Sequence, residues 1–402
     1  MSFGVYVHIP YCKQLCPYCD FSRYLIDKIM PPEKYVALLK QEISTRAAAV
    51  GPRPIQSLYF GGGTPSLFEP KLIVSVIDEL ANHGFSLEKN AELSIEIDPG
   101  TIDEKKLDAL IAAGFTRFSV GAQSFNDRLL ALAGRKHSSS DTRALLKLMS
   151  HKALNYSFDL LFSLPTQSLD DLRVDLDNVL EFEPSHLSAY LLNLSDKHPM
   201  NLGRADDDVQ VSMFNEIEHQ LKKKNLLRYE ISNFAKPGFE SKHNMLYWND
   251  QEYWGLGVSS HSYLKGLEGS LDWGARFSNP KRIHSYETQI AKSSAKTHSH
   301  QKWRFSDGLE PDDFESLAQH QALTDFCHTR LRLSEGLNAA AIVEKFSPYV
   351  WQLVFSRLND LAARGLVEFA EGFEQWRLTA QGKLLANLAF EKLVFSGDEL
   401  KS

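Results

Sequence analysis

The sequence lacks the features that mark several broad classes of protein. It has no run of eighteen apolar residues and no basic start followed by an apolar stretch, so neither a membrane-spanning helix nor a signal peptide is expected. Its 43% hydrophobic and 24% charged residues exclude a disordered or collagen-like chain. Its 44 basic residues are outnumbered by 51 acidic ones, which disfavours binding to nucleic-acid phosphates. We therefore expect a globular cytoplasmic protein without a nucleic-acid partner.

Cysteine is also scarce, and its placement is uneven. Three of the four cysteines, Cys12, Cys16 and Cys19, lie within eight residues, a layout that does not suit a disulfide framework in a chain of 402 residues. Their C-x3-C-x2-C spacing favours a metal centre, because three thiolates can hold three irons of a [4Fe-4S] cluster and leave the fourth iron open. A closed zinc site is the alternative, but it needs four ligands, and only His8 or Asp20 lies near enough in sequence to complete it.

Short β-branched and aromatic runs alternate with segments of helical period along the first half of the chain. The candidate strands are residues 4–8, 57–60, 93–97, 115–120, 157–161 and 186–192, and the candidate helices are 32–50, 70–83, 102–113, 138–149 and 169–182. Repeated β-α units predict a parallel sheet, and six of them predict an α/β fold with a partial (β/α)6 barrel. The site should then lie at the carboxyl ends of the strands. An open doubly wound sheet is the alternative that periodicity leaves open.

The sequence divides into three expected parts. Residues 1–225 hold the barrel, with a last helix at 206–224. Residues 226–310 form an extension whose glycine- and aromatic-rich part, 229–263, is expected to hold loops and short strands, with a polar, irregular connector from about 272. In residues 311–402 the sequence predicts helices at 312–333 and 338–364, followed by a hairpin and a final helix. This order resembles a winged-helix domain. This part has nine basic and thirteen acidic residues, so packing or partner docking is expected rather than DNA binding.

The cysteine segment and five later motifs together resemble one enzyme superfamily. The motifs are Tyr6-Val-His-Ile-Pro-Tyr-Cys12, Phe60-Gly-Gly-Gly-Thr64-Pro-Ser, Glu96-Ile-Asp-Pro, Gly121-Ala-Gln123-Ser-Phe, Arg135-Lys-His137 and Asp159-Leu-Leu-Phe-Ser-Leu-Pro. They are similar to the radical S-adenosylmethionine (radical SAM) superfamily, and within it to the branch that holds oxygen-independent coproporphyrinogen III oxidase and the HemW-type haem chaperones. The resemblance covers nearly the whole chain.

This resemblance implies cofactors and the residues that hold them. A [4Fe-4S] cluster would be held by Cys12, Cys16 and Cys19, with S-adenosylmethionine at its open iron and an electron donor to reduce it. The implied S-adenosylmethionine contacts are Gly62, Gly63 and Thr64 in the glycine-rich turn, Glu96 and Gln123 at strand ends, Arg135 facing the carboxylate, Asp159 toward the nucleoside, and Tyr6 and Tyr18 lining it.

Two departures separate the chain from the oxidase, and one segment favours the chaperone. Tyr6 stands almost at the start of the chain, where the oxidase carries a long extension, and Phe21 replaces a further cysteine. The segment His243-Asn-Met-Leu-Tyr247-Trp248 resembles the HemW signature that is associated with haem binding. A histidine flanked by aromatic residues can supply an axial nitrogen and a flat apolar wall. Taken alone, a histidine in such a setting is more often a packing residue, while His8 and His261, in segments at expected strand ends, fit hydrogen-bonded core histidines equally well.

The first hypothesis is therefore a radical SAM haem chaperone that binds haem and transfers it to recipient haem proteins. The resemblance suggests recipients that are respiratory and associated with the membrane, and it implies cleavage of S-adenosylmethionine without oxidase activity. The second hypothesis is an oxygen-independent coproporphyrinogen III oxidase. A zinc-bound structural module is the third.

Overall fold

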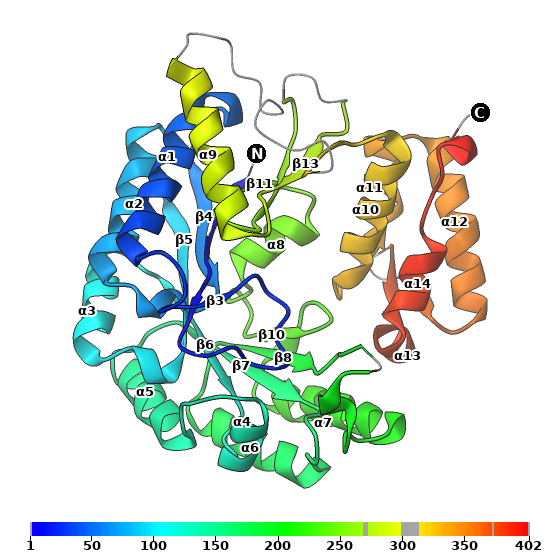
Figure 1. Ribbon diagram of the computed structural model, residues 1–402. Helices are drawn as coiled ribbons and strands as arrows, with labels where there is room; N and C mark the ends of the chain where they lie inside the picture. Colours follow the sequence, from blue (N-terminus) through cyan, green and yellow to red (C-terminus); the bar gives the residue numbers. More distant parts are fainter. Residues whose placement is uncertain (1, 196, 268–271, 299–312, 372–373, 401–402) are drawn as a thin grey trace.

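The computed structural model describes residues 2–195, 197–267, 272–298, 313–371 and 374–400. An α/β barrel forms the larger body, and a smaller, mainly helical body formed by the C-terminal residues packs beside it (Figure 1). In the described ranges, no helix combines the length and hydrophobicity that a membrane crossing requires.

The six predicted strands are confirmed and form the parallel centre of the sheet. They are β1 (Phe3–Ile9), β4 (Ile55–Gly62), β5 (Leu87–Ile97), β6 (Arg117–Gln123), β7 (Tyr156–Phe162) and β8 (His186–Leu191). Each pairs in parallel with its neighbour, and the order β1-β4-β5-β6-β7-β8 follows the chain. Six of the seven residues of β1 are buried, as expected for a strand covered on both faces.

Helices cover the outside of this sheet (Figure 1). They are α1 (Pro32–Val50), α2 (Pro70–Asn82), α3 (Glu104–Ala112), α4 (Asp127–Leu132), α5 (Ser139–His151), α6 (Leu169–Glu181) and α7 (Asp207–Lys223). Their starts are encoded locally: Ser138 and Ser168 each form a capping box with an aspartate three residues later. The α/β class and the partial barrel expected from the sequence are thus confirmed.

The sheet extends further than the sequence predicts. β11 (Glu252–Leu256) pairs in parallel with β1, and β12 (His261–Leu264), β13 (Ala275–Ser278) and β14 (Phe314–Ser316) follow it as antiparallel strands. At the other edge, β10 (Asn233–Ala235) and β9 (Leu227–Arg228) also pair antiparallel. A separate parallel pair, β2 (Tyr11–Cys12) and β3 (Tyr24–Leu25), frames the cysteine loop. The described residues of 226–310 therefore continue the barrel sheet.

Three local expectations are wrong. The connector expected to be irregular from about residue 272 contains β13 and α9 (Ile283–His298), and α9 packs on α1; residues 299–312 lie outside the described ranges. The helix expected at 312–333 begins only at α10 (Gln319–Arg332), because β14 precedes it. The helix expected at 338–364 is two, α11 (Ala339–Lys345) and α12 (Pro348–Ala363), since Pro348 favours the first turn of a new helix and Ser347 caps it.

The C-terminal body has a hydrophobic core of its own. A three-stranded sheet of β15 (Leu337–Asn338), β17 (Gln375–Leu378) and β16 (Val367–Ala370) packs with α10 to α12, α13 (Ala380–Leu384) and α14 (Ala386–Lys392). Ion pairs link this body to the barrel, from Lys345 to Asp250 and from Arg276 to Asp325. The hairpin and helices match the winged-helix-like order expected from the sequence, except that the single helix expected from Thr379 to about Phe395 is two, α13 and α14.

Candidate functional site

The three clustered cysteines line one cavity of about 350 Å³ at the carboxyl end of the barrel. Cys12 ends β2 and Cys16 is also buried, while the Cys19 amide donates to the Cys16 carbonyl at 3.2 Å and so closes the turn between them. All three are free thiols. Burial raises the pKa of Cys12 to about 11, so a metal bound here has to displace the proton. Across the described residues, no three histidine, cysteine or acidic side chains meet closely enough to hold a single ion.

The glycine-rich turn presses against the cysteine loop. A Cβ added to Gly63 would lie 2.7 Å from the Tyr11 carbonyl oxygen, so only glycine permits this approach. Gly62 has a φ of 111°, in the region that favours glycine. Thr64 follows, and its hydroxyl points at the Cys12 sulfur at 3.7 Å. The sequence-predicted turn therefore brings backbone amides beside the thiols.

Glu96, near the end of β5, is held inside the barrel by two donors. The Tyr59 hydroxyl donates to Glu96 Oε1 and the Gly62 amide to Oε2, both at 2.9 Å. Burial raises the pKa of Glu96 to about 7, although both hydrogen bonds favour the ionised form. Tyr59 is not among the residues predicted from the sequence; its position one residue before the glycine-rich motif is the available signal.

Arg135 lies between the cysteine loop and the strand ends. Its guanidinium donates to Asp98 at 2.6 Å and to the Gly121 carbonyl at 2.7 Å, and Nη1 lies 3.9 Å from the Cys16 sulfur. Its buried Nε has no hydrogen-bond partner among the described residues. Tyr18 lies against the same guanidinium. The arginine thus retains an unused donor next to the thiols, which suits an anionic group.

Gln123 of β6 and Asp159 of β7 lie near Glu96 and Arg135. Asp159 lies in the middle of β7, and the Ser119 hydroxyl donates to it at 3.1 Å. Burial raises the pKa of Asp159. Gln123 ends β6 with a φ of 69°, an unusual backbone conformation for a residue other than glycine.

A cavity of about 550 Å³, which we call the inner cavity, gathers these side chains. It is lined by all ten residues predicted from the sequence to bind a cofactor: Tyr6, Tyr18, Gly62, Gly63, Thr64, Glu96, Gln123, Arg135, Asp159 and His243. The cavity lined by the three cysteines, which we call the thiol cavity, adjoins it: both are lined by Cys19, the glycine-rich turn and Arg135. The motifs scattered over the sequence therefore meet in one place, and their individual roles stay predictions.

His243 is buried with both ring nitrogens engaged. It lies in α8 (Lys242–Trp248), where Nδ1 is 3.0 Å from the Ser57 hydroxyl and Nε2 is 2.7 Å from the Tyr247 hydroxyl. Its ring stacks on Tyr59 with 5.1 Å between centroids. Burial lowers the pKa of His243 to about 3, so the ring is neutral. Glu92 accepts hydrogen bonds from the His243 and Lys242 amides and so fixes the start of α8.

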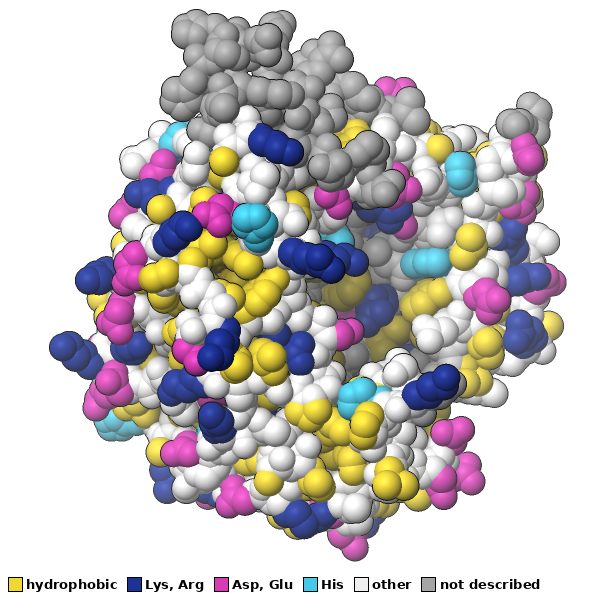
Figure 2. All heavy atoms as spheres, in the orientation of Figure 1, with side chains coloured by type: hydrophobic (Ala, Val, Ile, Leu, Met, Phe, Trp, Pro, Cys, Tyr) yellow, Lys and Arg dark blue, Asp and Glu magenta, His cyan; other side chains and the backbone are white. Residues whose placement is uncertain are grey.

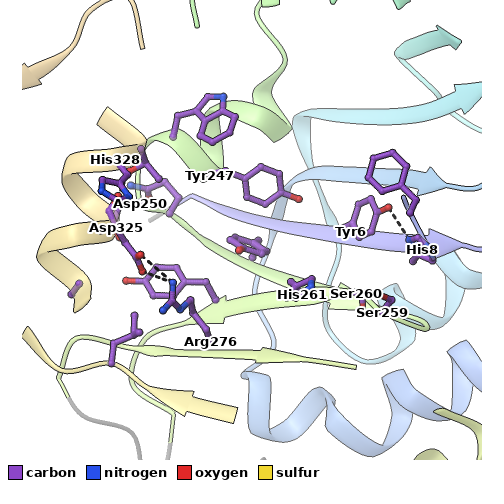
Figure 3. Close-up of a pocket in the computed structure, with 18 of the residues that line it drawn as sticks. Tyr6, His8, Tyr247, Asp250, Ser259, Ser260, His261, Arg276, Asp325 and His328 are labelled. Carbon is purple, nitrogen blue, oxygen red and sulfur yellow. Dashed lines mark hydrogen bonds and ion pairs between the residues drawn. The ribbon is translucent and has the colours of Figure 1, made fainter. Parts of the chain in front are cut away.

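A second cavity, of about 680 Å³, lies between the barrel and α10 of the C-terminal body; we call it the outer cavity (Figure 3). Its walls include Tyr247, Trp248, Tyr253 and Tyr263, and it shares Tyr6, Asp20, Phe21 and Tyr247 with the inner cavity. The space-filling view shows the surface hollowed between the two bodies (Figure 2). The sequence did not predict this cavity, because its walls come from three distant segments.

The histidines of the outer cavity differ from one another. His8 is a buried, hydrogen-bonded core residue, as the sequence allowed: its Nδ1 accepts from the Tyr6 hydroxyl and its Nε2 donates to the Ser22 carbonyl. His328 donates from Nε2 to the Phe390 carbonyl at 2.7 Å. For His261 the core interpretation is wrong, since it is exposed and its ring makes no hydrogen bond within the described ranges.

Comparison with known proteins matches two parts of the chain to family descriptions. Residues 6–179 match the radical SAM superfamily, and residues 317–385 match the HemN C-terminal domain. Over 400 residues the chain is 30% identical to the "Heme chaperone HemW" of Bacillus subtilis (strain 168), covering 96% of this chain and 98% of the relative. It is 28% identical to the protein of the same name from Escherichia coli (strain K12), covering 96% and 97%.

A solved structure shows the same fold over nearly the whole chain. The coproporphyrinogen III oxidase HemN from Escherichia coli, described as a radical SAM enzyme, superposes with a TM-score of 0.77 at 23% identity. The superposition covers 98% of this chain and 90% of that one. At this level of identity the likeness concerns the fold.

Proposed function

The chain belongs to the family of the heme chaperone HemW, within the radical SAM superfamily, and from this premise we propose that it binds haem and transfers it to recipient haem proteins. The observation that carries the proposal is the pair of adjoining cavities, one polar and next to three thiols, the other lined by aromatic rings. The cytoplasmic location, and recipients at respiratory membranes, are part of the same proposal.

The inner and thiol cavities fit a [4Fe-4S] cluster and S-adenosylmethionine. Three free thiols face one space, the Gly63 position tolerates no side chain, and the buried Nε of Arg135 is unused within the described residues. Cys12, Cys16 and Cys19 would hold the cluster, and Arg135 and Glu96 would receive the carboxylate and donor groups of S-adenosylmethionine. When bound, this pair supplies one-electron reductive cleavage of the sulfonium, with the electron coming from a donor protein.

This chain's own residues orient and enclose such a ligand. Asp98 fixes the guanidinium of Arg135, the Gly62 amide and Tyr59 fix the Glu96 carboxylate, and Tyr6 stacks against Tyr59 at 6.0 Å. The oxidase alternative is not proposed, because no feature of the described site favours it over the chaperone. In addition, Phe21 replaces the oxidase's further cysteine, so this position has no thiol.

An anaerobic titration of the cluster-reconstituted full chain with haem tests the proposal. We expect saturable binding at a ratio of one haem per chain, followed by loss of haem to apomyoglobin, used as a general acceptor. As a control, haem-loaded albumin in place of the protein measures the passive transfer of haem to apomyoglobin in the same assay. Absence of saturable binding, or release of carbon dioxide from coproporphyrinogen III under reducing conditions, would contradict the proposal.

A further inference from the structure

The outer cavity is shaped and lined for a flat conjugated ligand. Tyr247 and Tyr253 meet edge to face with 4.5 Å between centroids, and Tyr263 continues the wall, 6.4 Å from Tyr253. Such faces and edges bind planar apolar rings well, and a volume of about 680 Å³ is in the range of pockets for ligands of cofactor size. The inner cavity, by contrast, is lined by the carboxylates of Asp20, Glu96, Asp98 and Asp159 and by the guanidinium groups of Arg117 and Arg135.

Most histidines near these cavities use their ring nitrogens within the protein. His243 would have to give up its bond to Ser57 or to Tyr247 before it could bind a metal, and His8 has both ring nitrogens engaged. His328 uses Nε2 on a backbone carbonyl, and both ring nitrogens of His186 meet hydroxyls. Among the described histidines that line either cavity, His261 is left as the one whose ring makes no hydrogen bond.

The backbone of His261 is held firmly while its ring faces the cavity. His261 begins β12 and pairs with Ser278 of β13, and the Gly255 amide donates to Ser262 at 2.8 Å across the preceding turn. A Cβ at Gly255 would lie 2.2 Å from the His261 carbonyl oxygen, so this turn is tightly closed. In Figure 3 the His261 side chain lies along the cavity below Tyr6 and Tyr247. Burial lowers the pKa of His261, which favours the neutral ring that a metal binds.

We propose that haem binds in the outer cavity with His261 as an axial ligand of its iron, and that His243 is a positioning residue that holds Tyr247 in the shared wall. This inference rests on the proposed function. The 2.7 Å bond from His243 to the Tyr247 hydroxyl, together with the edge-to-face contact of Tyr247 with Tyr253, links the buried histidine to the aromatic wall. The signature around His243 would then act on haem through Tyr247 rather than through its own ring.

The test compares haem with metal-free protoporphyrin IX, which fills the cavity but cannot be ligated through iron. Both are titrated into the full chain carrying His261→Ala, His243→Gln or Tyr253→Ala, with His151→Ala as a control at an exposed histidine of α5. Electron paramagnetic resonance of ferric haem and the iron–histidine stretch of ferrous haem report the axial ligand. Protoporphyrin fluorescence reports occupancy of the cavity.

We expect His261→Ala to abolish the histidine signature and to weaken haem binding at least about tenfold, while protoporphyrin affinity stays near that of the parent chain. Tyr253→Ala should weaken both ligands, and His243→Gln should retain the histidine signature. Added imidazole should restore the signature in His261→Ala, and His261→Met should give a methionine-type spectrum, so a folding defect is distinguishable from loss of a ligand.

Each outcome bears on one claim. If the parent chain binds no haem, the proposed function fails. If it binds haem and His261→Ala keeps the histidine signature, or if His243→Gln removes it, haem binding stands and the assignment of His261 is overturned.

Discussion

The inner and outer cavities share a wall but differ in how their polar groups are used. In the inner cavity, Glu96 accepts from the Gly62 amide and Asp159 from the Ser119 hydroxyl, and Arg135 donates to Asp98 and to the Gly121 carbonyl. In the outer cavity, the rings of Tyr247 and Tyr253 line the wall near the Arg276–Asp325 ion pair, and the ring of His261 makes no hydrogen bond in the described part of the chain. A preorganised polar site suits a charged ligand, whereas an aromatic site with one unengaged nitrogen suits a flat metal-bearing ligand.

The difference also explains why neighbouring histidines need not share a role. His243 lines the inner cavity and is hydrogen-bonded to Tyr247, while His261 lines the outer cavity together with Tyr247. His243 is buried and both its ring nitrogens are hydrogen-bonded, whereas His261 is exposed. Burial with complete hydrogen bonding stabilises a fold, and an open ring nitrogen favours a ligand. If this comparison is right, the two cavities can be disabled separately.

The largest expected effect is loss of the cluster without loss of haem binding. Cys12→Ser removes one of three thiolates, and serine is a poor iron ligand, so iron and sulfide content after reconstitution should fall to background. Haem affinity should change by no more than about twofold, because the two sites are distinct. Cys327→Ser, at a buried cysteine of the C-terminal body, is the control. Loss of haem binding with the cluster would show that the cavities form one site.

The next effect concerns the charged side of the inner cavity. Arg135→Ala removes the guanidinium that contacts both Asp98 and the Cys16 sulfur, and a charge-assisted hydrogen bond contributes about 1.5–3 kcal/mol, so S-adenosylmethionine should bind about 10- to 100-fold more weakly. Equilibrium dialysis of the reconstituted protein measures this. Arg128→Ala, at an exposed arginine bonded to Thr166, should have no effect. Equal weakening in both variants would argue against a specific contact.

The barrel was predictable because its signals are local. The six central strands carry short apolar runs, and the helices between them have regular period. α1 was predicted with its observed bounds of Pro32 and Val50, because proline begins it and Gly51 follows its end. Short strands were expected in 229–263, but the antiparallel pairing of the extension was not predictable, since β12, β13 and β14 are only three or four residues long and depend on distant partners. Pro348, which divides the helix expected at 338–364 into two, is a visible signal in the sequence that the prediction did not use.

The site was predictable to the extent that motifs carry it. Motif residues from five strands of the barrel converge on the inner cavity, as the carboxyl ends of parallel strands must. Two motifs reach the outer cavity, through Tyr6 and His8 and through Tyr247 and Trp248, but its other walls, the β11–β12 turn, β13 and α10, carry no motif. Sequence also leaves open whether a histidine is engaged: His8 and His261 had the same interpretation, and only their surroundings in the fold separate them.

A smaller effect should appear as a pH dependence of the inner cavity alone. The pKa of Glu96 is about 7, so the carboxyl is neutral below this pH and ionised above it. A ligand that donates to the carboxylate binds the ionised form better, so S-adenosylmethionine affinity should fall up to about tenfold from pH 8 to pH 6. Glu96→Gln should bind more weakly at pH 8 and lack this transition. Isothermal titration at both pH values measures it, and an unchanged transition in the variant would assign the proton elsewhere.

The smallest expected effect tests the wall between the cavities. Tyr247→Phe keeps the ring but removes the hydroxyl that bonds His243 Nε2, which should lower the free energy of unfolding by about 1 kcal/mol in urea denaturation. Tyr349→Phe, which loses a longer hydroxyl contact on α12 at 3.3 Å, is the matched control and should change stability less. Haem affinity should fall only about 3-fold, because the aromatic face remains while the bond that holds it in place is lost.

The same substitution separates the two histidines without removing either. Tyr247→Phe frees Nε2 of His243, so if His243 were the axial ligand, haem would no longer compete with the tyrosine and its affinity should rise. If His261 is the ligand, the freed nitrogen stays buried beside the new phenyl ring and the axial signature is that of the parent chain. Two results together would contradict this assignment: haem affinity rises after Tyr247→Phe, and the histidine signature disappears when His243→Gln is added. His243 would then be the axial ligand, and the two cavities would form one haem site.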